Sequence, residues 1–393
     1  PLGPAFLLNE PDGKQRESLL QGSLKADYRF KPGLTMGFLL ALTRGHENFD
    51  RFQPTLPGFS FPAEATRSNA EKQNYTGDVH IHYRTRFGKH NLDLTGAYEY
   101  NAFTNQGFRL TAKGFLVPQL LTNNLGAANS IQTGDISSFK NAVRLISFLG
   151  RAVYQFDERY ILTATLRRDG SSKFGPGNRW GLFPSFAFAW RANNEAFLRD
   201  LKWLNSLKFR VSYGQTGNQE NLPPNSYQQL YGPAGNYLYN GSFQQSYAVT
   251  QEFNPDLKWE VRKSFNLGLD LSLWNNRLNA TVDLYRDRTS DMLFLYDLPQ
   301  PPFLTTQVYA NAANAYNRGM ELTISGEMVE TSHFSWTLSG NIATLRNRVT
   351  NLNGRFRGRD LSIANRHYGY ASGNGYSGAY ISEIKVGYPA GVF

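Results

Sequence analysis

The chain has 393 residues, with 36 glycines, 22 tyrosines and 28 phenylalanines, a mixture that favours strands and turns over helices. Cysteine is absent, which excludes a domain held by disulfides and a zinc site built from cysteines. The net charge of +10 comes from scattered Lys and Arg residues, and the lack of a recognition motif argues against nucleic-acid binding. No apolar run approaches the roughly 20 residues of a membrane-spanning helix, which excludes a helical membrane protein.

Alternating apolar and polar residues predict about twelve strands arranged as successive hairpins. Residues 264–274 show the pattern clearly, because Leu267 and Leu269 fall on one face of an extended chain and Asn266 on the other. The alternation continues beyond the roughly 5 to 6 residues of a globular strand and suits the roughly 9 to 11 of a tilted membrane strand. In chain order, the predicted strands cover residues 23–30, 34–42, 78–87, 91–100, 144–156, 160–168, 181–191, 206–214, 264–274, 278–288, 319–328 and 334–343.

The predicted connections alternate between short and long. Short turns are expected near residues 31–33, 88–90, 157–159, 275–277 and 331–333, and long polar segments near residues 47–70, 104–138, 216–257 and 297–314. Short turns at one end and long loops at the other are typical of an outer-membrane β-barrel. The sequence therefore predicts an all-β, antiparallel transmembrane β-barrel in which residues 1–393 form one partial barrel domain, with the long segments as extracellular loops.

Five motifs in the downstream half follow one another in a characteristic order and spacing. They are "RRDGSSKFGPGNRWGLFPSFAFAWR", "LKFRVSYGQTGNQ", "NPDLKWEVRKSFNLGLDLSLWNNRLNATVDLYRDRTSDML", "NRGMELTISG" and "IKVGYPAGVF". In these motifs the chain resembles the SusC/RagA family of TonB-dependent outer-membrane transporters. The resemblance is dense over residues 150–393 and weaker over residues 16–150.

The resemblance implies a complete barrel of about 22 strands with a plug in its lumen. The sequence opens among barrel strands, so we expect it to be a fragment that lacks the plug and the segment that contacts TonB. In the family the "GYPAGVF" stretch is internal, so we also expect further strands after it.

The same resemblance implies import of oligosaccharides or peptides through a barrel surrounded by outer-membrane lipid. The implied partners are a SusD-like surface lipoprotein that acts as a lid, and TonB as the source of energy. A dimer of the lidded complex is also compatible with the family. No catalysis, cofactor or metal is expected. The alternatives are an outer-membrane adhesin or structural barrel without transport, and a secreted β-rich glycosidase.

The segment 216–257 supplies the candidate substrate-binding residues, because it is rich in Tyr, Asn, Gln and Gly. Aromatic rings suit stacking on sugars or lining a peptide path, and amide side chains suit hydrogen bonding. The alternative is that these side chains only pack one loop against another. The candidates are Tyr231, Asn236, Tyr237, Tyr239 and Asn240.

Other motifs have plainer interpretations. His80 and His82 share a strand face that suits a metal, but no third ligand is identifiable. Asp270 and Asp283 would be the carboxylates of a glycosidase, although charged residues are ordinary in a wide barrel lumen. Residues 137–140, "SSFK", match the spacing of a serine acylase by accident in a long loop.

Two further segments have predicted positions. Residues 169–178, "DGSSKFGPGN", read as a turn between strands. Residues 195–207 have apolar positions at helical spacing and are expected to form a short helical connection. Five tryptophans are expected near strand ends in an interfacial aromatic girdle, namely Trp180, Trp190, Trp203, Trp259 and Trp274.

Overall fold

The computed structural model describes residues 12–55, 62–132, 134–361, 366–370 and 380–390. The long strands are β1 (Asp12–Lys31), β2 (Leu34–Gln53), β3 (Glu64–Phe87), β4 (His90–Phe115), β6 (Ile136–Phe156), β7 (Tyr160–Ser171), β8 (Trp180–Arg191), β9 (Leu204–Asn218), β12 (Glu260–Leu273), β13 (Leu278–Asp297), β14 (Gln307–Glu330) and β15 (Ser335–Asn351). The short elements are β5 (Ala128–Ser130), β10 (Leu230–Tyr239), β11 (Ser242–Gln251), β16 (Gly354–Phe356), β17 (Arg359–Leu361), β18 (Arg366–Tyr370), β19 (Tyr380–Ile384), and the 3-10 turns η1 (Pro118–Leu120), η2 (Leu125–Ala127) and η3 (Ala192–Asn194). None of the described residues belongs to a helix that is long and apolar enough to cross a membrane.

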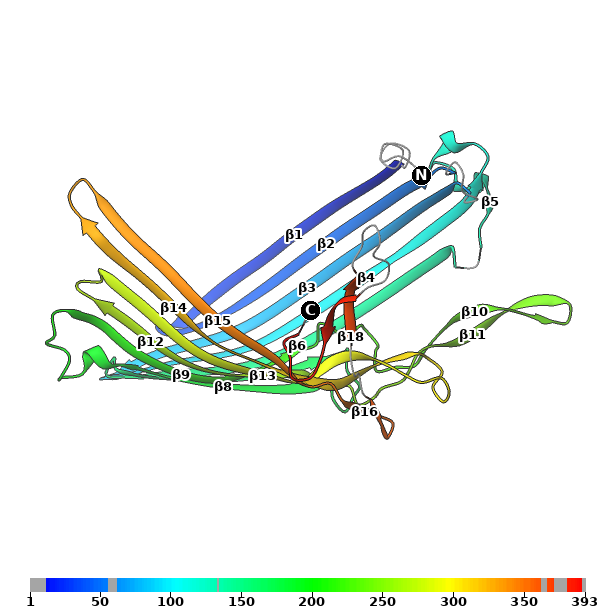
Figure 1. Cartoon of the computed structure of the whole chain (residues 1–393). Helices are drawn as coiled ribbons and strands as arrows, with labels where there is room; N and C mark the ends of the chain where they lie inside the picture. The colour runs from blue at the N-terminus through cyan, green and yellow to red at the C-terminus, as the bar shows by residue number, and fades with distance from the viewer. Residues whose placement is uncertain (1–11, 56–61, 133, 362–365, 371–379, 391–393) are drawn as a thin grey trace.

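The twelve long strands form one antiparallel meander in the order β1-β2-β3-β4-β6-β7-β8-β9-β12-β13-β14-β15, with β5 beside β4 (Figure 1). Each strand therefore pairs with the next long strand in the sequence, as successive hairpins require. The predicted all-β, antiparallel class is confirmed. Within the described residues, β1 and β15 are the two edges of this sheet and do not pair with each other.

The long connections are shorter than the sequence suggested, because the strands extend into them. The observed connections are residues 54–63, 116–135, 219–259 and 298–306. The expected segment 47–70, for example, contains the end of β2 and the start of β3, and residues 137–140 belong to β6 instead of a loop. The predicted turn at 169–178 is present between β7 and β8, where the connection covers residues 172–179.

Polar pairs explain why the strand ends were misread as loops. Arg44 of β2 donates to Glu71 of β3 at 2.6 Å, and Asn69 donates to Asn48 at 2.8 Å across the same two strands. These residues lie beyond the apolar part of each strand, so the alternation of apolar and polar residues stops there. The backbone ladder continues, because cross-strand hydrogen bonds and ion pairs stabilise it without apolar packing.

One face of the sheet is apolar and exposed. Leu267 of β12, Leu284 of β13 and Met320 of β14 lie opposite one another, and they are 44%, 46% and 37% exposed. The apolar run on β14 extends from Met320 to Met328, which matches the roughly 9 to 11 residues that a tilted strand needs to cross a bilayer. A continuous exposed apolar face of this kind is expected where the surrounding medium is lipid.

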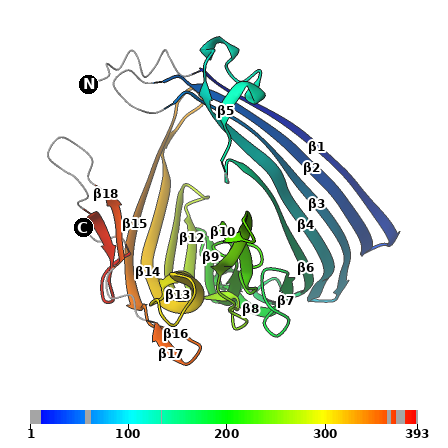
Figure 2. The ribbon, with the colours of Figure 1, turned by 90° about the vertical axis from the view of Figure 1, so that its right-hand side faces the viewer.

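The sheet is strongly curved. In Figure 2, β1 and β15 lie on opposite sides of an open trough whose wall is formed by the strands between them. The right-handed twist of adjacent strands produces this curvature, and further strands would close it into a barrel.

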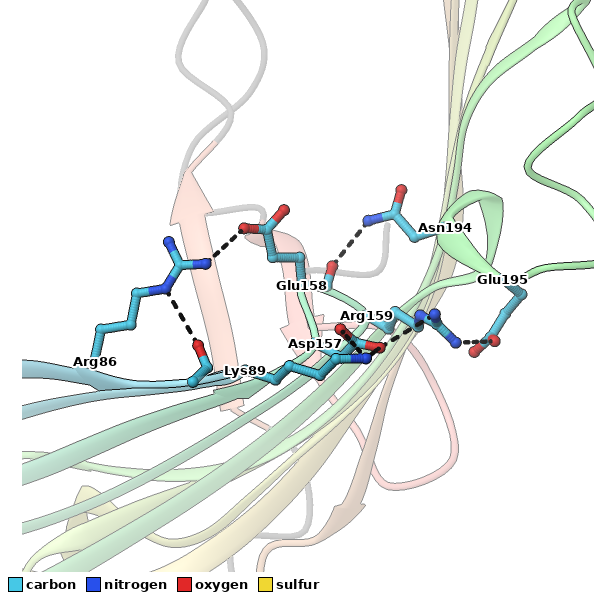
Figure 3. A network of polar contacts seen from close by, with 8 residues as sticks. Arg86, Lys89, Asp157, Glu158, Arg159, Asn194 and Glu195 are labelled. Carbon is cyan, nitrogen blue, oxygen red and sulfur yellow. Dashed lines mark hydrogen bonds and ion pairs between the residues drawn. The ribbon is translucent and has the colours of Figure 1, made fainter.

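At the end with the short turns, ion pairs connect three successive hairpins (Figure 3). Lys89 of the β3–β4 turn contacts Asp157 of the β6–β7 turn at 3.2 Å, and Arg159 contacts Asp157 at 3.1 Å. Arg159 also contacts Glu195 of the β8–β9 connection at 2.9 Å. The turns are therefore held to one another, which fixes the spacing of the hairpins at this end.

Glu195 directly follows η3 in the β8–β9 connection, where the expected helix over 195–207 is absent. The 3-10 turn η3 and further turns occupy residues 192–203, and β9 begins at Leu204. Tyr160 and Trp190 donate hydrogen bonds to the Glu195 carboxylate at 2.6 and 3.1 Å. The backbone forms separate turns here, with Leu198 and Arg199 donating to the Glu195 carbonyl at 3.0 and 2.9 Å, and they do not continue into a helix.

We expect the Glu195→Gln variant to melt at a lower temperature than the wild-type protein at pH 7. The hydrogen bonds from Tyr160 and Trp190 lower the pKa of Glu195 from its ordinary value of 4.5. Its contribution to stability is therefore complete above that value and is lost as pH falls through the lowered pKa. Thermal melting in detergent from pH 7 to pH 3 checks this, since the difference between the two proteins should shrink with acid. A difference that stays constant with pH would contradict it.

Trp259 departs from the predicted girdle. Its ring is 7% exposed and packs against Phe174 and Phe183, with ring centroids 5.0 and 5.6 Å away. Its indole nitrogen donates to the carbonyl of Arg179 at 3.1 Å. Trp259 thus joins the β7–β8 connection to the start of β12. By contrast, the expected girdle position of Trp180 is compatible with its exposed ring.

Candidate functional site

The face opposite the apolar one carries ion pairs that cross several strands. Arg210 of β9 donates to both carboxylate oxygens of Asp270 of β12 at 2.9 Å, and it also donates to Asp283 of β13 at 3.2 Å. One guanidinium therefore neutralises both carboxylates that were considered as a glycosidase pair. A hydrolytic pair would need one carboxyl group protonated and the other aimed at a water or sugar carbon, which this shared contact does not provide.

His80 and His82 also lie on this polar face. A ring nitrogen of His80 lies 2.6 Å from Asp78, and one of His82 lies 2.6 Å from Asp93. Each imidazole is thus paired with its own carboxylate. Over the described ranges, no group of three or more His, Cys, Asp or Glu side chains is arranged to hold a metal ion.

A groove of about 430 Å³ lies where the connections fold onto the polar face. Asn74 of β3 and Asn101 of β4 form one wall, and Glu220 from the connection after β9 forms another. Residues of β3 and β4 share this groove with the connection after β9 because the sheet curves around it (Figure 2). The polar face is therefore the concave face. The other lining residues are Phe103, Val143, Leu145, Lys173, Gln219 and Pro224.

Two buried polar side chains lie at this groove. Lys173, in the β7–β8 connection, is 8% exposed, and its ammonium donates to the backbone carbonyl of Gln219 at 3.1 Å. Burial lowers the pKa of Lys173, because a cation is disfavoured away from water. The side-chain Oε1 of Gln219 is buried and has no hydrogen-bond partner among the described residues. The groove itself presents the amides of Asn74 and Asn101 and the carboxylate of Glu220, which suit a polar ligand that can donate and accept hydrogen bonds.

Sequence reasoning missed this groove. Lys173 belongs to the segment interpreted only as a turn, and Gln219 directly follows β9. The contact joins residues that are 46 positions apart. The available signal was a lysine next to a phenylalanine in a loop rich in Gly, Ser and Pro.

The five predicted binding residues all lie on the hairpin β10–β11 or at its tip. In Figure 1 this hairpin projects from the main sheet at the end with the long connections. Its turn is formed by Asn240 and Gly241, with φ angles of 47° and 77°. A two-residue hairpin turn of this hand requires positive φ at both positions, which Asn and Gly tolerate best. Asn240 therefore has a conformational role at the tip.

The hairpin divides the other four candidates between its two faces. Residues directly opposite in a hairpin share a face, and Tyr237 and Tyr239 lie opposite Gln244 and Ser242. The register shifts between Pro233 and Asn236, which places Tyr231 and Asn236 together on the other face. That second face also contains Leu238, Phe243 and Tyr247, all of them strongly exposed.

These features define the wall of an outer-membrane β-barrel, apolar toward lipid and charged toward the lumen. A family model described as "TonB dependent receptor-like, beta-barrel" matches residues 3–389. The chain belongs to this family, whose members are receptors of the bacterial outer membrane and carry out transport, not enzymatic catalysis.

Individual relatives agree with this assignment. The chain is 33% identical to TonB-dependent receptor P3 of Formosa agariphila, over 89% of this chain and 35% of that protein. It is 28% identical to TonB-dependent receptor SusC of Bacteroides thetaiotaomicron, over 96% of this chain and 39% of SusC. A structure of the RagAB peptide transporter superposes with a TM-score of 0.82 at 25% identity, over 98% of this chain and 40% of that one.

The resemblance to the SusC/RagA family is therefore confirmed. The chain spans between about a third and two fifths of the length of these relatives.

Proposed function

We propose that the complete protein imports oligosaccharides or peptides across the outer membrane, powered through TonB and covered by a SusD-like lipoprotein lid. The observation that carries the proposal is the groove on the concave face, which Asn74, Asn101 and Glu220 line together with apolar side chains. Relationship to SusC and to the RagAB peptide transporter supports the two substrate classes. Amides and single charges in the groove suit either class, because both carry many hydrogen-bond donors.

We further propose that residues 1–393 form one partial barrel domain with its long connections outside the cell. Outer-membrane barrels have short periplasmic turns and longer extracellular loops. The connection 219–259 with the hairpin β10–β11 would then stand at the outer mouth of the lumen, where a substrate arrives.

The two faces of the hairpin suggest two roles. Tyr237 and Tyr239 lie opposite the polar residues Gln244 and Ser242 on one face of the hairpin, which suits contact with a hydrogen-bonding substrate. The face with Tyr231, Asn236 and Phe243 is largely apolar, and we assign it to the lid lipoprotein, because exposed apolar faces of this kind mark protein contacts.

Two double variants of the full-length protein test this division, and each is the control of the other. Tyr237→Ala with Tyr239→Ala should raise the substrate concentration for half-maximal uptake about tenfold, as expected for two lost ring contacts. Phe243→Ala with Tyr247→Ala should instead reduce the amount of lid that co-purifies. Equal effects of both variants on both measurements would contradict the assignment.

A growth test separates import from the adhesin alternative. Cells that depend on this protein are grown with an oligosaccharide mixture or a peptide mixture as the limiting nutrient, with TonB present or deleted. An importer requires TonB for growth on one of the mixtures. An adhesin or structural barrel gives growth that does not change when TonB is deleted, and that result would refute the proposal.

A further inference from the structure

A row of three arginines crosses the outward, apolar face of β13, β14 and β15. Arg286 lies directly opposite Arg318, and Arg318 lies directly opposite Arg346. The next row contains three more cations, in the order Lys263, Arg288, Tyr316, Arg348 across β12 to β15. All six cationic side chains, five arginines and one lysine, are exposed. Together they are called the arginine row below.

The register places these side chains on the lipid-facing side. Arg286 and Leu284 are two positions apart on β13, and Arg318 and Met320 are two positions apart on β14, with no register shift between them. Residues two apart on a strand share a face, so the arginines continue the apolar face. The nearby acidic residue Asp287 is one position away from Arg286 and Arg288, so its side chain lies on the other, concave face of the sheet. It is paired there with Arg262.

The arginine row lacks a counterion of its own. Among the described residues, none of the six cations forms an ion pair, although like charges directly opposite on neighbouring strands are destabilising. Elsewhere on the same face the chain supplies its own carboxylates. Arg44 is paired with Glu71 at 2.6 Å, and Arg67 with Asp50 at 2.8 Å, just beyond the apolar part of β2 and β3.

The level of the row along the strands indicates what neutralises it. The row begins directly after the apolar run that extends from Met320 to Met328 on β14, on the side of the long connections. With the proposed orientation, this is the level of the lipid head groups in the outer leaflet. A second copy of this chain would bring the same positive charges to the same place and would be repelled.

We propose that the arginine row binds the phosphate groups of a phosphorylated lipid head group in the outer leaflet. Guanidinium groups match phosphate oxygens with paired hydrogen bonds, and each such bond is charge-assisted. A groove of about 520 Å³ is lined by Arg286, Arg318, Arg346 and Thr344 and gives the head group a seat. The Tyr316 ring lies 6.0 Å from the guanidinium carbons of Arg286 and Arg318, so it holds both beside that seat.

The test uses the full-length protein, extracted in mild detergent, with lipid A as the probe because it carries two phosphates on a sugar head group. Native mass spectrometry during a lipid A titration measures the affinity. The variant Arg286→Gln with Arg318→Gln and Arg346→Gln should bind at least tenfold more weakly, and Arg318→Gln alone should show part of that loss. The matched control removes three exposed arginines at the short turns, by Arg86→Gln, Arg199→Gln and Arg277→Gln, and should keep wild-type affinity.

Several results would overturn the proposal. Wild-type affinity in the row variant would do so, and so would an equal loss in the control, which would indicate only a general charge effect. Displacement of lipid A by inorganic phosphate at equal phosphate concentration would indicate a site for free anions. If the row variant instead lost an acidic protein that co-purifies with the wild-type protein, and kept its lipid A affinity, the row would be a surface that binds protein and not lipid. Because lipid binding is measured without uptake, failure of TonB-dependent uptake would refute the proposed function and leave this result standing.

Discussion

Replacing Ile324 with arginine is expected to lower the free energy of folding into a bilayer by about 2–4 kcal/mol. Ile324 lies at the middle of the apolar run on β14 and is 41% exposed. A charged side chain at this depth must leave water for hydrocarbon or distort the bilayer around it. Denaturant titration of the full-length protein in phospholipid vesicles measures the loss.

The neighbouring residue is the control. Thr323 faces the opposite side of the same strand, opposite Thr281 of β13 and Asn341 of β15. Thr323→Arg therefore places the same charge toward the aqueous lumen and is expected to change the folding free energy by less than about 1 kcal/mol. Equal losses at the two positions would mean that the apolar face does not border lipid, and the membrane assignment of this strand would be wrong.

Replacing Trp259 with alanine is expected to cost about 3–5 kcal/mol in the local stability of the connections above the concave face. The ring fills the space between Phe174 and Phe183, and its indole nitrogen satisfies the carbonyl of Arg179. Removing it leaves a cavity and an unpaired acceptor together. Limited proteolysis should cut residues 172–179 and 219–259 much faster, because local opening becomes more frequent.

Trp180→Ala is the matched control for Trp259. Its ring is 42% exposed and lies 4.8 Å from the Arg168 guanidinium, so its loss is expected to change proteolysis only slightly. If Trp259→Ala is cut no faster than Trp180→Ala, the buried cluster does not hold the connections in place. Substrate uptake should fall with Trp259→Ala, since Lys173 and the groove depend on the same connection.

Most of the strand order was predictable, because lipid imposes the alternation of apolar and polar residues. The hairpin from Phe265 to Leu284 shows this directly, since each leucine of β12 lies opposite an apolar residue of β13, as the alternation requires. The strand ends were not predictable in this way. Cross-strand pairs such as Arg44 with Glu71 stabilise the backbone ladder where both faces of the sheet are in water. The alternation of apolar and polar residues stops there, so it does not reveal these strand ends.

The candidate site was predictable in composition but not in geometry. The aromatic and amide content of residues 216–257 indicated Tyr231, Tyr237 and Tyr239, and all three lie on one hairpin. Their division between two faces depends on a register shift between Pro233 and Asn236, where Gly235 has a φ of 95°. Pro and Gly inside a strand indicate a bulge, but composition alone does not show which faces the flanking side chains take. The contact of Lys173 with Gln219 depends on tertiary folding, as does the burial of Trp259, which sequence alone placed in the girdle.

Strands β3 and β4 span Glu64–Phe87 and His90–Phe115, more than twice the roughly 9 to 11 residues that a bilayer crossing needs. About half of each strand therefore extends beyond the lipid, and the hydrogen bonds between β3 and β4 keep that part rigid. In the orientation that we propose, a substrate would meet this rigid rim before it reached the plane of the membrane. Because β14 is also 24 residues long, the rim is raised on that side as well, and adaptation to a substrate would fall to the connections, such as the projecting hairpin β10–β11.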